Sequence, residues 1–256
     1  MIFEPFFVCA QAIGACVFIL WLISIPIRDV SIADIWWGPG FAVIAWTAWL
    51  NTTPISSRYG LVVAVMTLWG LRLASFMARR NLGHGEDKRY QAMRGDSVHY
   101  WWVALFQVFI LQGALQLIIA LPLYAAALGQ KAMGVLDYVG IIIALAGVAI
   151  EAVADHQLKR FKSSPDSAGQ VMNQGLWGYS RHPNYFGNAV LWTGMGLVGI
   201  GSGGPWWTLV GPAIMIFLLL KVSGVAMLES TITERRPAYR QYMDEVPAFI
   251  PWPKKR

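Results

Sequence analysis

The densest group of side chains able to do chemistry lies in residues 175–188, directly before and inside an apolar stretch. Arg181 and His182 precede Pro183, and a proline at the first position of a helix loses no amide hydrogen that the helix needs. The free backbone N–H groups at such a helix start bind anions. Together with the two basic side chains, they predict a site for phosphate or carboxylate.

The same stretch places Asn184, Gly187 and Asn188 on one face of the helix that follows. The small Gly187 would let another backbone or a flat ligand approach closely. The alternative is a capped helix at the membrane interface, with Trp177 and Tyr179 as interfacial aromatic residues. The number of polar side chains beside a small residue favours the binding site.

A second group is spaced for one side of a helix. Glu151, Asp155, Lys159 and Lys162 follow each other at intervals of four, four and three residues. They could form a ladder of salt bridges at a helix end. Glu151, however, lies inside an apolar stretch, where a helix facing lipid would not carry an acid. We therefore expect the stripe to face a ligand.

A third group lies beyond the last apolar stretch. Glu229 and Arg236 are two helical turns apart and could fix one another, or the ribose and phosphate of a ligand. Tyr239 and Tyr242 follow. The terminal residues 254–256 are all basic and are typical of a contact with anionic lipids.

Two more polar residues lie in apolar surroundings. Asp34 precedes Trp37, and a carboxyl group in such surroundings should be neutral or paired. A neutral acid could donate a hydrogen bond to a carbonyl. Its alternative role is to cap the helix start together with Ser31. Arg72 is costly inside an apolar stretch unless it meets an anion or a carboxylate. Either function or a structural ion pair would explain it.

Apolar helices must position these groups. Of the 256 residues, 56% are hydrophobic and only 13% are charged, and the mean hydropathy is +0.49, which is typical of an integral membrane protein. We predict an all-α membrane fold. The expected spans are seven stretches of about 20 apolar residues each: Pro5–Ile27, Ile32–Leu50, Tyr59–Ala78, Trp101–Leu123, Gly134–Ala154, Tyr185–Ile200 and Trp206–Val222.

The charges predict the orientation of these spans. All of the 20 basic residues except Arg58 and Lys131 fall on one side of a seven-span arrangement, and cytoplasmic loops hold such an excess. We therefore expect the N-terminus outside and the C-terminus in the cytoplasm. The net charge of +6 is of the juxtamembrane kind and does not favour nucleic acid as a partner. No spacing of Cys and His predicts a metal site.

The third group and the Arg181 motif carry a family resemblance. Residues 175–187, Glu229 and the ending 235–251 resemble the steroid 5α-reductase family, in its bacterial branch once described only as a domain of unknown function. Residues 69–72 and the loop 86–90 fit that branch as well. The resemblance implies one seven-helix domain over residues 1–256, with the cofactor motifs in about 100–256. It also implies a multi-pass protein of the bacterial inner membrane.

The resemblance further implies NADPH as the cofactor and a flat, apolar, steroid-like or enone lipid as the substrate. Hydride would reach the double bond of a 3-oxo-Δ4-steroid or similar enone while an acid polarises the carbonyl oxygen. From the motifs and the resemblance together, we predict cofactor contacts from Glu151, Asp155, Lys159, Lys162, Trp177, Tyr179, Arg181, His182, Asn184, Tyr185, Asn188, Glu229, Arg236, Tyr239 and Tyr242.

The catalytic side departs from the family. Trp37 and Trp69 stand where animal members carry an acid and a tyrosine, and an indole N–H can donate a hydrogen bond but cannot deliver a proton. Asp34 is then the nearest proton source, and Arg72 could support the oxyanion. The predicted catalytic residues are Asp34, Trp37, Trp69 and Arg72.

Two other functions remain as alternatives. A membrane methyltransferase that uses S-adenosylmethionine, of the isoprenylcysteine carboxyl methyltransferase type, shares the Arg-His-Pro core. The basic residues near that core suit a dinucleotide with several phosphates better than a cationic sulfonium. A transporter is disfavoured because the polar residues gather at one face instead of crossing the midplane. No obligate protein partner is predicted.

Overall fold

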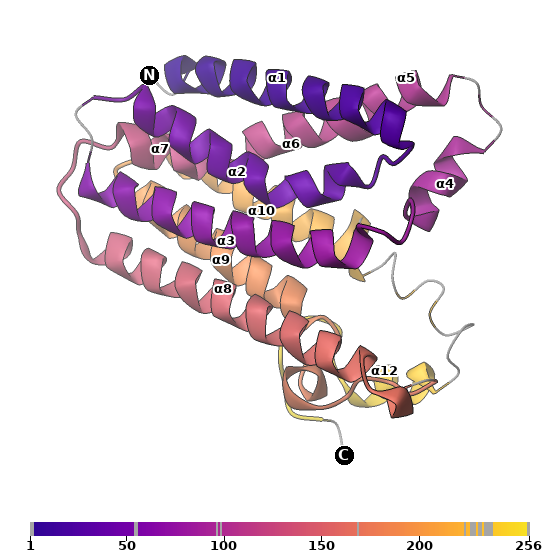
Figure 1. Ribbon diagram of the computed structural model, residues 1–256. Helices are drawn as coiled ribbons and strands as arrows, with labels where there is room; N and C mark the ends of the chain where they lie inside the picture. The colour runs from indigo at the N-terminus through magenta and orange to yellow at the C-terminus, as the bar shows by residue number, and fades with distance from the viewer. Residues whose placement is uncertain are drawn as a thin grey trace. The chain divides into compact units, whose positions relative to one another are not determined.

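The computed structural model describes residues 3–53, 56–95, 97, 99–167, 169–222, 224–225, 229, 232 and 238–254. Every regular element in these residues is a helix (Figure 1). The chain divides into two compact units, the first of Met1–Asp137 with Val198–Gly211 and the second of Tyr138–Leu197 with Pro212–Arg256. The predicted all-α class is therefore confirmed for the described residues.

In the first unit, α2 packs on both α1 and α3, and α1 also packs on η1 and α6 (Figure 1). The backbones of α2 and α3 meet at two glycines, because a Cβ atom on Gly38 would lie 2.9 Å from the carbonyl oxygen of Gly70. The helices of this unit are α1 (Phe3–Ile27), α2 (Ile32–Leu50), α3 (Ser57–Asn81), α4 (Lys88–Arg94), α5 (Tyr100–Ala104), the π-helix η1 (Leu105–Ile110), α6 (Leu111–Ile119), α7 (Leu121–Leu128) and η4 (Trp206–Leu209).

A buried ion pair closes one end of the first unit. Arg58 Nε lies 2.6 Å from Asp137 Oδ1, and the two side chains are 1% and 0% exposed. The same guanidinium donates to the carbonyl oxygens of Gly129, Lys131 and Ala132. Arg58 therefore ties the start of α3 to the connection that leads to Asp137.

In the second unit, α8 (Val135–Lys162) and α9 (Pro183–Gly201) touch through glycines. A Cβ atom on Gly187 would lie 2.7 Å from the Gly147 carbonyl oxygen, and one on Gly194 would lie 2.4 Å from that of Gly140. The remaining elements are η2 (Pro165–Ser167), η3 (Gly175–Gly178), α10 (Val210–Phe217), η5 (Leu218–Val222) and α12 (Tyr239–Glu245).

All seven predicted apolar stretches form helices, and α2 has the predicted bounds. The fourth stretch ends early, at Ile119, because a new helix with Pro122 in its first turn begins after the break at Ala120. The fifth continues beyond Ala154 to Lys162, because the polar residues after Ala154 extend the same helix past the end of the apolar run.

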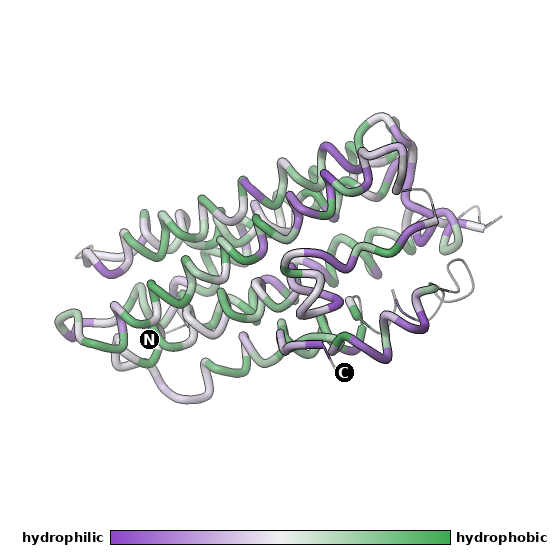
Figure 2. The backbone as a smooth tube through the Cα atoms, turned by 90° about the horizontal axis from the view of Figure 1, so that it is seen from below, coloured by the Kyte–Doolittle hydropathy of each residue, from purple (hydrophilic) through white to green (hydrophobic). Residues whose placement is uncertain are grey.

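By length and composition, four helical segments of the described chain can cross a membrane: Glu4–Ile27, Ser57–Asn81, Tyr100–Ile119 and Val135–Lys162. Figure 2 shows hydrophobic residues along most of the helices and hydrophilic ones mainly at their ends and connections. The protein is therefore an all-helical, multi-pass membrane protein. The count of seven spans and the orientation stay predictions.

Candidate functional site

The turn before α9 is anchored on α8. The Leu176 amide donates to Gln157 Oε1 at 3.0 Å, and the buried Trp177 donates its indole N–H to the Ala154 carbonyl at 3.0 Å. Gly175 has a φ of 57°, a conformation that favours glycine. Trp177 is therefore an internal anchor and not an interfacial aromatic residue.

The C-terminal segment, residues 238–252, folds back on this turn. Tyr242 donates its hydroxyl to the Trp177 carbonyl at 2.5 Å, and Ser180 Oγ donates to the Phe249 carbonyl at 2.8 Å. The Trp252 amide donates to the carbonyl of Tyr179, whose side chain is exposed, at 2.9 Å. The turn is thus held between α8 and the C-terminal segment.

Three ionisable side chains, Arg181, His182 and Glu229, lie together at the end of the turn before α9. Arg181 Nε and Nη2 donate to the two carboxylate oxygens of Glu229 at 2.7 and 2.9 Å. His182 Nε2 lies 2.9 Å from the same Oε1. Burial opposes ionisation of this carboxyl, but the hydrogen bonds from His182 and Arg181 outweigh it and lower the pKa of Glu229 to about 2. Glu229 is therefore a carboxylate at neutral pH.

Arg181 makes further bonds to backbone. Its Nη1 donates to the carbonyl oxygens of Met243 at 2.8 Å and Val246 at 2.7 Å. Nearly all N–H donors of the guanidinium are used by these four bonds, and the residue is only 8% exposed. Arg181, predicted to bind phosphate, is thus part of an internal hydrogen-bond network.

Polar side chains line the facing surfaces of α8 and α9. Glu151 and Asp155 are each 4% exposed. Asn184 Nδ2 donates to Asp155 Oδ1 at 3.1 Å, which joins two of the predicted groups directly. The buried Asn188 has an Oδ1 without a hydrogen-bond partner among the described residues. Such a buried acceptor is costly unless a donor meets it.

The remaining predicted cofactor residues belong to the same unit. The ring of Tyr185 stacks on that of His182, with centroids 5.6 Å apart and planes at 1°. Lys159 and Lys162 are exposed on the last turns of α8. Tyr239 is buried against Tyr242, and burial, with the nearby Glu229, raises its pKa to about 12. Arg236 lies outside the described residues.

Asp34 is an acceptor at the start of α2. Its Oδ1 accepts from the Tyr90 hydroxyl at 2.7 Å and its Oδ2 from Arg89 at 2.6 Å. The N-cap residue is Ser31, which makes no capping bond and instead accepts from the Asp87 amide at 2.7 Å. The capping alternative for Asp34 is therefore wrong, because its carboxylate is bonded to Arg89 and Tyr90 of α4.

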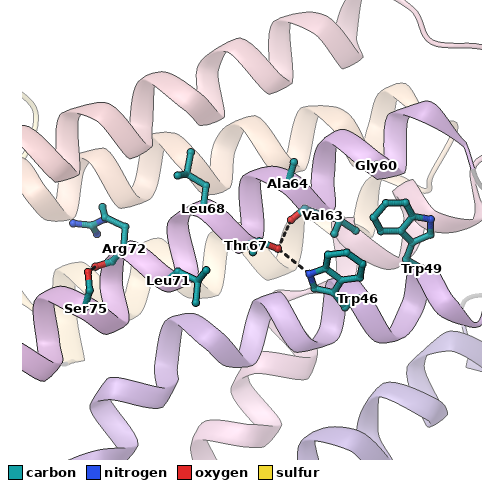
Figure 3. A pocket seen from close by; sticks show the side chains of 10 residues that line it. All are labelled: Trp46, Trp49, Gly60, Val63, Ala64, Thr67, Leu68, Leu71, Arg72 and Ser75. Carbon is teal, nitrogen blue, oxygen red and sulfur yellow. Dashed lines mark hydrogen bonds between the residues drawn. The ribbon is translucent and has the colours of Figure 1, made fainter.

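The other predicted catalytic residues lie along α2 and α3. Trp37 packs edge-on against Phe41, and the fully buried Trp69 contacts the same ring, with the centroids of Trp69 and Phe41 5.7 Å apart. Arg72 lines an open groove of about 740 Å³ on α2 and α3, with Ser75 beside it (Figure 3). The lining residues are Trp46, Trp49, Gly60, Val63, Ala64, Thr67, Leu68, Leu71, Arg72 and Ser75.

Sequence reasoning did not single out several residues that hold the site. Ser180 accepts from the His182 amide at 3.1 Å, and its place just before the proline-started helix is a signal for such a role. Gln157 lies on α8 beside Asp155 without any motif. Arg89 and Tyr90 belong to the family-like loop, but nothing in their spacing relates them to Asp34.

A protein-family model described as "Protein of unknown function (DUF1295)" matches residues 20–246. The chain belongs to this family. DUF1295 proteins are related to the steroid 5α-reductases. An uncharacterised protein of Schizosaccharomyces pombe is 26% identical over 272 residues, covering 91% of this chain and 76% of that protein. The 3-oxo-5-alpha-steroid 4-dehydrogenase 1 of Macaca fascicularis is 29% identical over 111 residues, covering 43% and 37%. No solved structure matches.

Proposed function

We propose that this DUF1295 protein is a membrane reductase that uses NADPH to reduce the double bond of a 3-oxo-Δ4-steroid or a similar enone lipid, in the bacterial inner membrane. The relation to steroid 5α-reductases supports a reductase-like function. The observation that carries the cofactor assignment is the polar surface of α8 and α9, with its buried acids and amides and its exposed lysines.

The residues of this surface fit a nicotinamide dinucleotide. The Asn188 Oδ1, which has no hydrogen-bond partner within the described part of the chain, can accept from a carboxamide N–H. Asp155 can accept from a ribose hydroxyl in addition to Asn184. Lys159 and Lys162 are exposed cations that can meet phosphates. We assign these contacts to NADPH, with Tyr185 and His182 as a paired aromatic surface beside them.

When bound, the reduced nicotinamide supplies the hydride. The chain must then stabilise negative charge on the substrate carbonyl oxygen and provide a proton. We assign the first task to N–H donors among Trp37, Trp69 and Arg72. We assign the second to Asp34, which can donate only in its protonated form, with its ion pair to Arg89 broken. The apolar groove beside Arg72 has a volume in the range of small-molecule sites, which supports an apolar substrate (Figure 3).

Ligand protection tests the cofactor. The detergent-purified protein should unfold at a higher temperature with NADPH, and the shift should exceed that with NADH or S-adenosylmethionine at equal concentration. The reason is that a ligand of the native state stabilises it, by about 2.7 kcal/mol at a hundred times Kd. Thermal unfolding followed by tryptophan fluorescence measures this. Protection by S-adenosylmethionine alone would instead favour the methyltransferase.

Asp34→Asn tests the proton donor. Turnover of an enone lipid should fall by about 10²- to 10⁴-fold, the usual contribution of a general acid, while NADPH protection stays unchanged. Asp87→Asn is the matched control, because Asp87 also pairs with Arg89 but not with Tyr90. Equal turnover losses in the two variants would reduce Asp34 to a partner of Arg89.

A further inference from the structure

We propose that Arg181 and Glu229 are positioning residues: they form an internal clasp that fastens the C-terminal segment to the turn before α9 and orients His182. This inference refines the proposed function, since it removes one cation from the predicted phosphate ligands. The clasp consists of the side chains of Arg181 and Glu229.

The clasp connects three parts of the second unit. Arg181 stands in the turn, Glu229 precedes the C-terminal segment, and the two form a bidentate pair with N–O distances of 2.7 and 2.9 Å. The other guanidinium edge holds the carbonyls of Met243 and Val246, at the end of α12. The Arg181 amide also donates to the Pro247 carbonyl at 3.0 Å. Arg181 therefore donates three hydrogen bonds to the C-terminal segment.

Glu229 also fixes the imidazole of His182. Its Oε1 accepts from both Arg181 Nε and, at 2.9 Å, His182 Nε2. A carboxylate at Nε2 requires the proton on that nitrogen. When the ring is neutral, Nδ1 is then the acceptor, and the stacked Tyr185 keeps the ring from turning. His182 is thereby held in one ring orientation and, when neutral, in one tautomer.

The charge balance argues against Arg181 as a phosphate ligand. Its guanidinium is neutralised by a bidentate carboxylate that is itself only 13% exposed. A phosphate would have to replace Glu229 or share the guanidinium with it, against the repulsion of two anions. Lys159 and Lys162, in contrast, are exposed on the last turns of α8, where a phosphate can reach them from solvent.

Hydrogen exchange of the cofactor-free protein in detergent tests the clasp. Arg181→Lys keeps the charge but loses the planar fork. Amides of residues 238–252 should exchange about ten- to a hundredfold faster, as expected for the loss of charge-assisted hydrogen bonds, while those of α2 and α3 are unchanged. Glu229→Gln is the milder variant, and Lys159→Gln is the control. The double variant Arg181→Lys/Glu229→Gln should be no worse than the more severe single one.

Unchanged exchange in both single variants would overturn the clasp. The hydrogen-exchange experiment needs no nucleotide, so it tests the clasp even if the proposed binding of NADPH is wrong.

A nucleotide arm separates positioning from phosphate binding. If Arg181 positions the C-terminal segment and His182, Arg181→Lys weakens the binding of NADPH and of NADH about equally, and the ratio of their Kd values is unchanged. If Arg181 instead binds the 2′-phosphate, Arg181→Lys weakens NADPH alone, and the Kd for NADH divided by the Kd for NADPH falls. Exchange of residues 238–252 then stays as in the parent protein, and the inference is overturned. Lys159→Gln should show the opposite pattern, with normal exchange and a weaker affinity for NADPH.

Discussion

Arg58→Met should destabilise the folded protein by about 3–5 kcal/mol, the usual effect of removing one partner from a buried ion pair. The substitution would leave Asp137, which is 0% exposed, without its main donor, and would free the carbonyls of Gly129, Lys131 and Ala132. Unfolding in detergent, followed by circular dichroism against temperature and denaturant, measures the loss.

Two further variants show that the pair is the cause. Arg79→Met alters an exposed arginine at the other end of the same helix and should change stability by less than about 0.5 kcal/mol. Arg58→Met/Asp137→Leu removes both charges, and should recover much of the loss because no unpaired carboxylate remains. A double variant as unstable as Arg58→Met alone would show that the carbonyl contacts, not the ion pair, dominate.

The helices could be predicted from the sequence because each is encoded locally. Runs of apolar residues indicate helices without reference to the rest of the chain, and Pro183 marks the start of one. Helix α2 begins and ends where its apolar run does. The fourth stretch was predicted too long, since hydropathy alone does not indicate that Pro122 lies in the first turn of a new helix. Periodicity therefore predicts helices better than it predicts their ends.

Partners across the chain could not be predicted in the same way. The sequence showed Arg58 only as one of two basic residues on the side of the membrane with few charges. In the structure it is the buried ion-pair partner of Asp137. Arg181 has the residue type of a phosphate ligand, and only the fold shows that a carboxylate 48 positions later occupies it. Residue type gives the chemistry that a side chain can do, while the partner decides which part of it is used.

One signal in the sequence predicts a contact that was not recognised. Gly140 and Gly147 are seven residues apart on α8, and Gly187 and Gly194 have the same spacing on α9. A spacing of seven keeps small residues on one helix face, where they allow close packing in membranes. Read together, these pairs would have predicted that α8 and α9 touch, and hence that Asp155 can reach Asn184.

The functional proposal depends on that helix contact more than on any single polar residue. Asp155 lies one turn beyond Glu151 on α8, and Asn184 lies almost one turn before Gly187 on α9. The backbones of Glu151 and Gly187 are in direct contact. A change in the helix separation would therefore move the acids of one helix away from the amides of the other.

Gly187→Val should accordingly abolish NADPH protection and destabilise the protein by about 1–3 kcal/mol or more, the range for overpacking. A Cβ atom at this position would lie 2.6 Å from the Glu151 amide nitrogen and 2.7 Å from the Gly147 carbonyl oxygen, both backbone atoms that cannot turn aside. Gly14→Val is the matched control, because a Cβ atom there meets nothing within 4 Å. Thermal unfolding with and without NADPH measures both effects. Full NADPH protection in Gly187→Val would mean that the cofactor does not depend on the α8 and α9 surface, and the assignment of Asp155, Asn184 and Asn188 would have to be abandoned.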